Sequence, residues 1–433
     1  MQHIRSIVIG CAIATLLLAC GRNERVIRLV IHNHSDNALI DYPMAIGADT
    51  LGRPDGEARF PLLVSNHNDT LAVQLDDTNG DGKWDELFFV INLEPRQKRM
   101  LTFRWIADSL AFEQRTSVRH GVRTALDDTV QRARSGTFLP RQLPLVTGYQ
   151  PFQTDGPSWE NDLVGFRHYL DGRNSKDVFG KRVAYMSPQN VGINERGVTE
   201  DNYHTMEDWG RDILSVGNSL GIGGVSLLIG EDNLYRMGSI EGDTLGPVDR
   251  TDFKVYSEGP VRSILDFQYH HWRLPVIGRV YSAQEIVEIW PGFHGYKNTI
   301  SFSGLQGDEH AVIGLVNSRT DQELNEVYID DQWIVLATHD QQTYEKEWWL
   351  GLALVLPRLT YEGYMKAPDV GRIATTYLAK LRLEESKPVS YYALACWELR
   401  DPGFRDTHYF EEYLRDFVRR LSNNVTIAIH YDN

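Results

Sequence analysis

Short runs of β-branched and aromatic residues, separated by turns rich in Gly, Asp and Asn, follow one another along most of the chain. Residues 261–269 are an example, because alternation places Val261, Leu265 and Phe267 on one face, as in a strand with one buried side. Almost no helical period separates the runs, which favours antiparallel pairing. The pattern therefore predicts an all-β protein built from antiparallel β-sandwiches. Further candidate strands are 26–31, 71–75, 87–90, 100–105, 296–302, 311–316, 349–355, 391–397 and 425–431.

One helix is expected near the C-terminus, between residues 407 and 421. Asp406 or Thr407 can cap its first turn, and Arg419 and Arg420 suit the negative end of its dipole. Its apolar side chains form a single stripe at helical spacing. The stripe consists of Tyr409, Phe410, Tyr413, Leu414, Phe417, Val418 and Leu421.

The chain of 433 residues exceeds the size of a typical domain. We expect a small β-sandwich domain at 21–110 and a large β-sandwich domain at 156–433. The segment 111–155, with Pro140, Pro144 and Pro151, is interpreted as a linker with helical character.

Residues 1–20 have the order of a secretory signal, with His3 and Arg5 ahead of an apolar run that ends in Leu-Leu-Ala-Cys20. The run is too short for a membrane-spanning helix. It resembles a bacterial lipoprotein signal, which implies acylation of Cys20 and a lipid anchor in the cell envelope, at the outer membrane. Cys396 would then be the remaining thiol, and a buried, inert state is expected for it.

The net charge of −15, from 59 acidic and 44 basic side chains, argues against nucleic acid as a partner. It leaves room for an anionic ligand, since a local basic pocket can exist in an acidic protein.

The acidic stretch 76–86 is typical of a structural calcium loop. Oxygen-bearing side chains alternate along it, and Gly82 permits the sharp turn that directs them at one ion. Phe88 stands where such loops usually carry a glutamate, so an Asp/Gly-rich hairpin without an ion is the alternative. The candidate ligands are Asp77, Asn79, Asp81 and Asp85, with Glu86 as an alternative to Asp85.

Aromatic, charged and glycine residues crowd into the segment 158–224, which indicates a pocket for a polar ring. Trp159 and Trp209 are candidates for stacking on sugar faces. Further contacts to substrate are expected from Asn161, Asp208, Asp212 and His271, although His271 falls on the apolar phase of its strand and is equally compatible with the core.

Acid–base candidates lie in the same segment. His204 stands between Tyr203 and two acids, Glu207 and Asp208, and could act as a base or be structural. Carboxylates could instead form a glycosidase pair. The candidates for that pair are Glu160, Asp162, Asp208, Asp212 and Glu288. The sequence contains no His-Glu-x-x-His motif for zinc and no Gly-x-Ser-x-Gly motif for a serine hydrolase.

Several of these motifs together resemble an orphan family of secreted Bacteroidota proteins that are encoded among polysaccharide-degrading enzymes. At least one relative in that family acts as an ulvan oligosaccharide dehydratase, so the resemblance implies activity on a glycan. The strand-rich remainder is similar to the galactose-mutarotase-like supersandwich. The motifs are Trp159-Glu160-Asn161-Asp162, Phe166-Arg167-x-Tyr169, Tyr203-His204, Trp209-Gly210-x-Asp212, Gly221-Ile222-Gly223-Gly224 and Gly259-Pro260-Val261-Arg262.

The leading hypothesis is a carbon–oxygen lyase that acts by β-elimination on uronic-acid-containing oligosaccharides without a cofactor. His204 would be the base and Tyr169 the acid, while Arg167, with Asn161 or Lys181, would neutralise the uronate carboxylate. A glycoside hydrolase and a non-catalytic glycan-binding lipoprotein are the alternatives.

Overall fold

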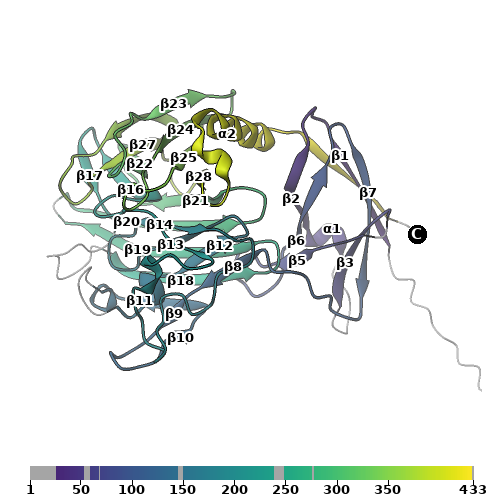
Figure 1. Ribbon diagram of the computed structural model, residues 1–433, viewed down its shortest axis with the longest axis horizontal. Coiled ribbons are helices and arrows are strands. Elements are labelled where there is room, and N and C mark those ends of the chain that lie inside the picture. The colour runs from purple at the N-terminus through teal and green to yellow at the C-terminus, as the bar shows by residue number, and fades with distance from the viewer. Residues whose placement is uncertain are drawn as a thin grey trace, which may run out of the picture.

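A computed structural model describes residues 26–52, 59–67, 69–144, 150–237, 248–275 and 277–431. Antiparallel strands form a small and a large sandwich that lie side by side, and one long helix lies near the C-terminus (Figure 1). The expected all-β fold is confirmed. Cys20 and the expected signal at 1–20 lie outside the described residues. Across the described ranges, no helix is long and apolar enough to cross a bilayer.

The small sandwich packs a five-stranded sheet on a three-stranded one. Alternation puts Ile27, Leu29 and Ile31 into its core, together with Phe103 of the same sheet and Phe89 of the three-stranded sheet. The five-stranded sheet has the order β29 (Val425–Tyr431), β1 (Ile27–Asn33), β7 (Lys98–Ile106), β3 (Phe60–Ser65) and β4 (Thr70–Leu71). The three-stranded sheet has the order β2 (Leu39–Gly47), β6 (Glu86–Leu93) and β5 (Val73–Asp76), and the short helix α1 (Ala48–Leu51) follows β2.

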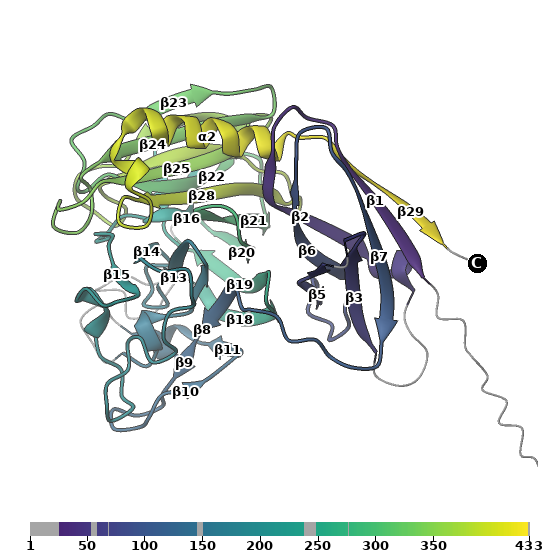
Figure 2. The same cartoon turned by 45° about the vertical axis from the view of Figure 1, so that its right-hand side comes forward.

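The C-terminal strand returns to the small sandwich. β29 pairs with β1 along its whole length, from Ile27 opposite Tyr431 to Asn33 opposite Val425. Figure 2 shows the two strands side by side at the edge of the small domain. The domain boundary expected from the sequence therefore needs correction, because 425–431 belongs to the small domain and not to the large one. Alternation marks 425–431 as a strand but does not reveal its partner.

The large sandwich contains one nine-stranded and two five-stranded sheets. The nine-stranded order is β11 (Ser135–Phe138), β18 (Val248–Glu258), β19 (Ser263–Leu274), β20 (Arg279–Ile289), β21 (Gly295–Ser303), β28 (Val389–Trp397), β25 (Leu350–Pro357), β24 (Trp333–Asp340) and β23 (Asn325–Tyr328). One five-stranded sheet has the order β15 (Gly210–Asp212), β14 (Lys176–Lys181), β13 (Val164–His168), β12 (Ser158–Asn161) and β8 (Thr116–Arg119). The other has the order β17 (Asn233–Tyr235), β16 (Ile222–Ile229), β22 (Glu309–Val316), β27 (Thr376–Arg382) and β26 (Tyr361–Lys366).

Part of the nine-stranded sheet is buried on both faces. In β25, Leu352 and Leu354 pack into the core between the sheets, while Val355 joins the cluster under α2 (Thr407–Leu421). The predicted helix is thereby confirmed, and Asp406 caps it by accepting a 2.9 Å hydrogen bond from the Tyr409 amide. Cys396 is a buried free thiol in the same cluster, as the sequence predicts.

The segment 111–155 is part of the large sandwich and not a helical linker. β8 pairs with β12, and β11 pairs with β18 at the edge of the nine-stranded sheet. β9 (Gly121–Val122) and β10 (Gln131–Arg132) form a hairpin, and the described helical residues of the segment are two 3₁₀ turns, Pro140–Gln142 and Gln153–Asp155. The correction follows from cross-strand pairing, which a short segment does not encode locally.

Candidate functional site

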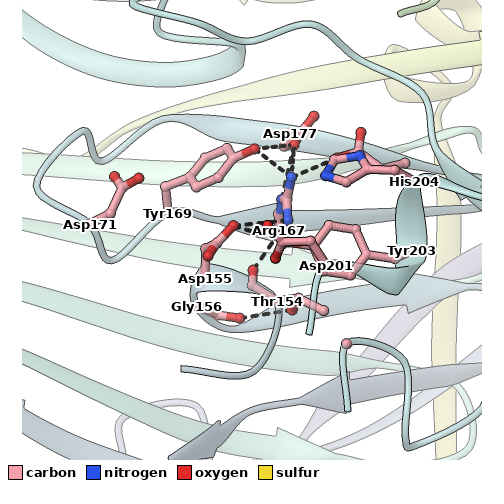
Figure 3. Close-up of polar contacts among 12 residues, drawn as sticks. Thr154, Asp155, Gly156, Arg167, Tyr169, Asp171, Asp177, Asp201, Tyr203 and His204 are labelled. Atoms are coloured by element: carbon pink, nitrogen blue, oxygen red, sulfur yellow. Dashed lines mark hydrogen bonds and ion pairs between the residues drawn. The ribbon is translucent and has the colours of Figure 1, made fainter. Parts of the chain in front are cut away.

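A buried guanidinium forms the centre of a polar cluster on the sheet β15-β14-β13-β12-β8. Arg167 in β13 is 1% exposed. It donates to Asp177 Oδ2 from Nε at 2.9 Å and from Nη2 at 2.6 Å (Figure 3). It also donates to Asp212 Oδ2 at 2.7 Å. The sheet register explains the contacts, because Arg167 lies opposite Asp177, and Asp212 lies on the next strand but one.

Two tyrosines complete the cluster around Arg167. The Tyr169 hydroxyl donates to Asp177 Oδ2 at 2.7 Å and accepts from Arg167. The guanidinium lies 4.3 Å from the ring centroid of Tyr169 and 4.8 Å from that of Tyr203. Burial raises the pKa of both phenols, so both stay protonated.

The backbone beside this cluster is strained. Thr154 and Asp155 have φ values of 49° and 61°, in the left-handed region that a β-branched residue avoids. Each such residue costs about 1–3 kcal/mol, and strain of this kind gathers at functional sites. Arg167 contacts both residues, at 3.4 Å to the Thr154 carbonyl and 3.4 Å to Asp155 Oδ2. At the next position, Gly156, a Cβ atom would lie 2.0 Å from the His168 carbonyl oxygen.

His204 connects the buried cluster to solvent. Its side chain is 46% exposed, and its Nδ1 lies 3.5 Å from Asp212 Oδ2. It ends the 3₁₀ turn Asn202–His204, where Tyr203 anchors the turn through hydroxyl contacts to Asp155 at 3.1 Å and Asp201 at 3.0 Å. Since Nδ1 faces the carboxyl group, Nε2 is the ring nitrogen left for a ligand.

The electrostatics of the cluster favour the protonated form of Asp212. Burial and the nearby Asp177 raise the pKa of the Asp212 carboxyl group well above its usual range. Partial burial and the charge of Arg167 lower the pKa of His204. The imidazole is therefore neutral near neutral pH. It becomes a better oriented base when Asp212 ionises and its carboxylate accepts a hydrogen bond from the Nδ1–H group.

Around His204 lies a rim that the sequence does not indicate. The Tyr344 ring is 43% exposed, and its centroid lies 6.2 Å from the His204 ring. The Arg319 guanidinium is 5.7 Å from the Tyr344 ring, and Arg211 lies 5.8 Å from the Trp348 ring. The Tyr344 amide donates to the Ile213 carbonyl at 2.9 Å, which fixes the loop 341–349 beside β15.

Four expected site residues, Arg167, Tyr169, His204 and Asp212, come together in this cluster, whereas Lys181 and Asn161 serve other contacts. Lys181 Nζ lies 2.6 Å from Glu160 Oε2 and donates to the Asn161 carbonyl at 2.7 Å. The Asn161 amide donates to the carbonyls of Trp290 at 2.8 Å and Phe293 at 2.9 Å. The role expected for these two residues is corrected, because their buried donors already have partners.

The expected roles of Arg167 and Tyr169 also need correction. Arg167 already contacts three carboxyl groups, those of Asp155, Asp177 and Asp212, so it is not available to neutralise a substrate carboxylate. Tyr169 is 6% exposed and donates its proton to Asp177, which leaves it no path to a leaving oxygen. Both residues support the Asp212–His204 pair.

The two tryptophans are not stacking platforms. Trp159 is 1% exposed and packs on Phe166, with ring centroids 6.2 Å apart. Trp209 is 4% exposed and packs on Phe179 at 6.0 Å. Their large apolar surfaces contribute to the core, and the stacking role expected for them is wrong.

Asp208 and His271 are exposed. Asp208 lies in the turn before β15. His271 is in β19, where the register shifts between Tyr269 and Trp272 and His271 has a φ of 52°. This bulge turns its side chain to solvent, 65% exposed and 3.7 Å from Asp249, and not onto the apolar face that simple alternation predicts. It lies in the nine-stranded sheet, whereas His204 is in the 3₁₀ turn Asn202–His204.

The remaining carboxylates considered for a glycosidase pair are held by cations. Glu160 contacts Arg119 at 3.1 Å in addition to Lys181. Asp162 lies 2.5 Å from Arg115, and Glu288 lies 2.7 Å from Lys297. These contacts favour structural ion pairs.

The expected calcium loop folds its oxygens onto its own backbone. Asp77 accepts from the amides of Gly80 at 2.6 Å and Gly82 at 2.8 Å, and Asn79 accepts from Asp81 at 2.9 Å. Asp85 accepts from the Thr78 amide at 2.8 Å. Within the described ranges, no group of three His, Cys, Asp or Glu side chains is arranged to hold a metal. Calcium binding stays a prediction.

The fold and the cluster define a two-domain, all-β protein with a histidine–carboxylate pair on its larger sandwich. A family model described as "Domain of unknown function (DUF4861)" matches residues 31–427, so the chain belongs to this family. The chain is 24% identical to "Uncharacterized protein P7" of Formosa agariphila, a member of the Bacteroidota, over 99% of this chain and 100% of that protein. These matches agree with the resemblance to an orphan family with members in the Bacteroidota.

Two solved structures from Enterococcus faecalis are distantly similar. An alpha-mannosidase has a TM-score of 0.47 at 10% identity, covering 94% of this chain and 46% of that one. A protein of glycosyl hydrolase family 38 has a TM-score of 0.48 at 9% identity, covering 94% and 47%. The chain thus spans about half the length of these structures.

Proposed function

We propose that the protein is a carbon–oxygen lyase that acts by β-elimination on uronic-acid-containing oligosaccharides, with His204 as the base. One observation supports this most strongly: a half-exposed, neutral imidazole faces the buried carboxyl group of Asp212. Once Asp212 is ionised, its carboxylate fixes the ring and raises the basicity of the outer nitrogen of His204. Proton abstraction from carbon needs such a base.

The reaction breaks the C5–H bond of the uronate and transfers the proton to His204 Nε2. The electron pair left on carbon 5 forms a double bond to carbon 4, and the bond from carbon 4 to its oxygen breaks. The imidazolium returns the proton to that oxygen, which leaves as water or as a sugar hydroxyl. In a syn elimination, one imidazole can therefore serve both steps without Tyr169.

The C5 proton is weakly acidic while the neighbouring carboxylate keeps its charge, so a cation must face that carboxylate. Arg319, on the rim beside Tyr344, has the charge and the fork geometry for it. Arg211 already contacts Glu347 Oε1 at 3.4 Å and is 12% exposed, so it is the weaker candidate. The exposed Tyr344 ring provides a face on which a sugar ring can stack.

The test is the formation of an unsaturated product, followed by its ultraviolet absorbance, by the wild type and by the variants His204→Gln and His271→Gln. We expect His204→Gln to lose the activity and stay folded, while His271→Gln, which changes an exposed histidine in β19, keeps it. Equal activity in both variants would remove His204 from the reaction.

We also propose that the protein is held in the cell envelope by a lipid on Cys20, on the basis of the Leu-Leu-Ala-Cys20 sequence. Labelling with a radioactive fatty acid tests this. The wild type should take up the label and Cys20→Ser should not. A labelled Cys20→Ser protein, or an unlabelled wild type, would contradict the proposal.

A further inference from the structure

A cleft lies where the two sandwiches meet. It has a volume of about 280 Å³ and is lined by β2 of the small domain, the turn after β20, and the end of α2. We call this site the interdomain cleft. Its lining includes Tyr42, Ala45, Glu288, Trp290, Lys297, Tyr392 and Arg420. The lining contains no residue of the His204 cluster or its rim, so the cleft is a separate site.

Two arginines fix the walls of the interdomain cleft. Arg115 donates to both oxygens of Asp41 in β2 at 2.7 Å and also contacts Asp162 of the large domain. Arg262, from the large domain, donates to Asp76 of the small domain at 2.7 Å. At Gly292 the backbones meet so closely that a Cβ atom would lie 2.6 Å from the Asp41 Cβ. The cleft is therefore preformed, and a ligand pays little to order it.

The interdomain cleft combines aromatic rings with charged hydrogen-bonding groups. The Trp290 and Tyr392 rings, whose centroids lie 6.3 Å apart, are only 7% and 9% exposed. Tyr42 is the more exposed aromatic ring of the lining. In the same lining, Lys297 Nζ contacts Glu288 Oε1 at 2.7 Å, and both side chains are partly exposed. Arg420 donates one hydrogen bond to the Gly292 carbonyl at 3.1 Å.

This chemistry fits a sugar acid. The partly exposed Tyr42 ring can accept the apolar face of a pyranose, Glu288 can accept from its hydroxyl groups, and Lys297 and Arg420 can donate to a carboxylate. A purely apolar ligand would desolvate the Lys297–Glu288 pair without replacing its hydrogen bonds, which is unfavourable. We infer that the interdomain cleft binds a uronate unit of an oligosaccharide as a second, non-catalytic site. The inference rests on the proposed function for its ligand class.

The test is isothermal titration calorimetry on the full chain with His204→Gln, which keeps the ligand intact. Glucuronan and polygalacturonate tetrasaccharides are each titrated, with cellotetraose as the neutral comparison. Ala45→Trp obstructs the cleft from an exposed strand position, and Lys297→Met removes the cation. Ala428→Trp is the matched control, because Ala428 is an exposed strand residue of β29 outside the cleft.

We expect two molecules of a uronate tetrasaccharide per chain, falling to one in Ala45→Trp, and about tenfold weaker binding at one site in Lys297→Met. The Ala428→Trp variant should still bind two tetrasaccharide molecules per chain. A stoichiometry unchanged by Ala45→Trp, or equal filling of the cleft by cellotetraose, would overturn the inference and leave the proposed function standing. One molecule per chain that Ala45→Trp abolishes would support the cleft and contradict a substrate site at His204. No binding would overturn both.

Discussion

Replacing Asp212 by Asn removes the carboxylate that orients His204 and leaves the rest of the cluster unchanged. The substitution keeps the shape of the side chain, and Arg167 keeps its two contacts to Asp177 at 2.9 and 2.6 Å. The fold should therefore survive. The amide carries no negative charge to face the Nδ1–H group of His204, so the outer nitrogen, Nε2, becomes a weaker base.

The expected loss in kcat follows from the geometry of the pair. A positioned acid or base contributes about 10²–10⁴-fold, and the 3.5 Å separation of Asp212 and His204 places this pair toward the lower end. We expect a loss of about 10²- to 10³-fold, or about 3–4 kcal/mol of transition-state stabilisation. The loss should grow as the pH rises, because the wild type gains activity when Asp212, with its raised pKa, ionises.

The same substitution also changes how the free energy of unfolding depends on pH. The pKa of Asp212 is higher in the folded protein than in the unfolded chain, so the folded state binds more protons between the two values. Wild-type stability therefore falls as the pH rises through this window. Asp212→Asn removes the titrating group, so its stability relative to the wild type should increase with pH.

The assay is the pH profile of kcat for unsaturated-product formation, together with denaturant unfolding at each pH. Asp208→Asn is the control, because Asp208 is an exposed carboxylate four residues earlier. If Asp212→Asn keeps more than half of the wild-type kcat on the alkaline side, the carboxylate does not activate His204 and the reasoning fails.

Three further predictions concern other parts of the molecule. Lys176→Met leaves Glu285 buried without its partner at 2.5 Å and should cost about 3–5 kcal/mol of unfolding free energy. The double variant with Glu285→Met should recover most of this stability. A loss that the double variant does not recover would contradict the prediction. Burial alone would raise the pKa of Glu285, but Lys176 holds it below its usual value, so the contribution of the pair should be present above about pH 4 and disappear as the pH falls through the folded pKa. Tyr344→Ala should raise KM about fivefold with little change in kcat, as expected for about 1 kcal/mol of stacking, and a loss confined to kcat would speak against a stacking role. Calcium should raise the unfolding temperature of the wild type but not of Asp81→Ala, and a wild type that is indifferent to both calcium and a chelator has no such site.

The strand content and the C-terminal helix could be predicted from local patterns, because alternation and the stripe ending at Leu421 are properties of neighbouring residues. The return of β29 to the small domain could not, since any strand of matching alternation can pair with β1. The same limit applies to 111–155, whose short strands obtain their stability from distant partners.

The candidate site was partly visible in the same way. Arg167 in β13 and Tyr169, directly after this strand, share one face by alternation, but their partners Asp177 and Asp212 depend on the strand register. Trp159 lies opposite Phe166 and so points to the other face of the sheet from Arg167. A crowded stretch of sequence therefore divides between core and site, and only the pairing shows which residue belongs to which.

The rim had no sequence signal of comparable strength. Tyr344 follows β24, well over a hundred residues after His204, and reaches the site because its loop hydrogen-bonds to Ile213. The bulge that exposes His271 is equally invisible to a two-residue period. Contacts that join distant segments decide both cases.

Elimination with His204 as the base has a defined mass balance, because no water is added to the substrate. A uronate oligosaccharide is incubated with the wild type or with His204→Gln, and the products are measured by mass spectrometry. We expect the wild type to yield either a product lighter by one water or two fragments, one unsaturated, whose masses sum to that of the substrate. His204→Gln should yield neither. Fragments that sum to the substrate plus one water, or a substrate left unchanged by the wild type, would contradict it.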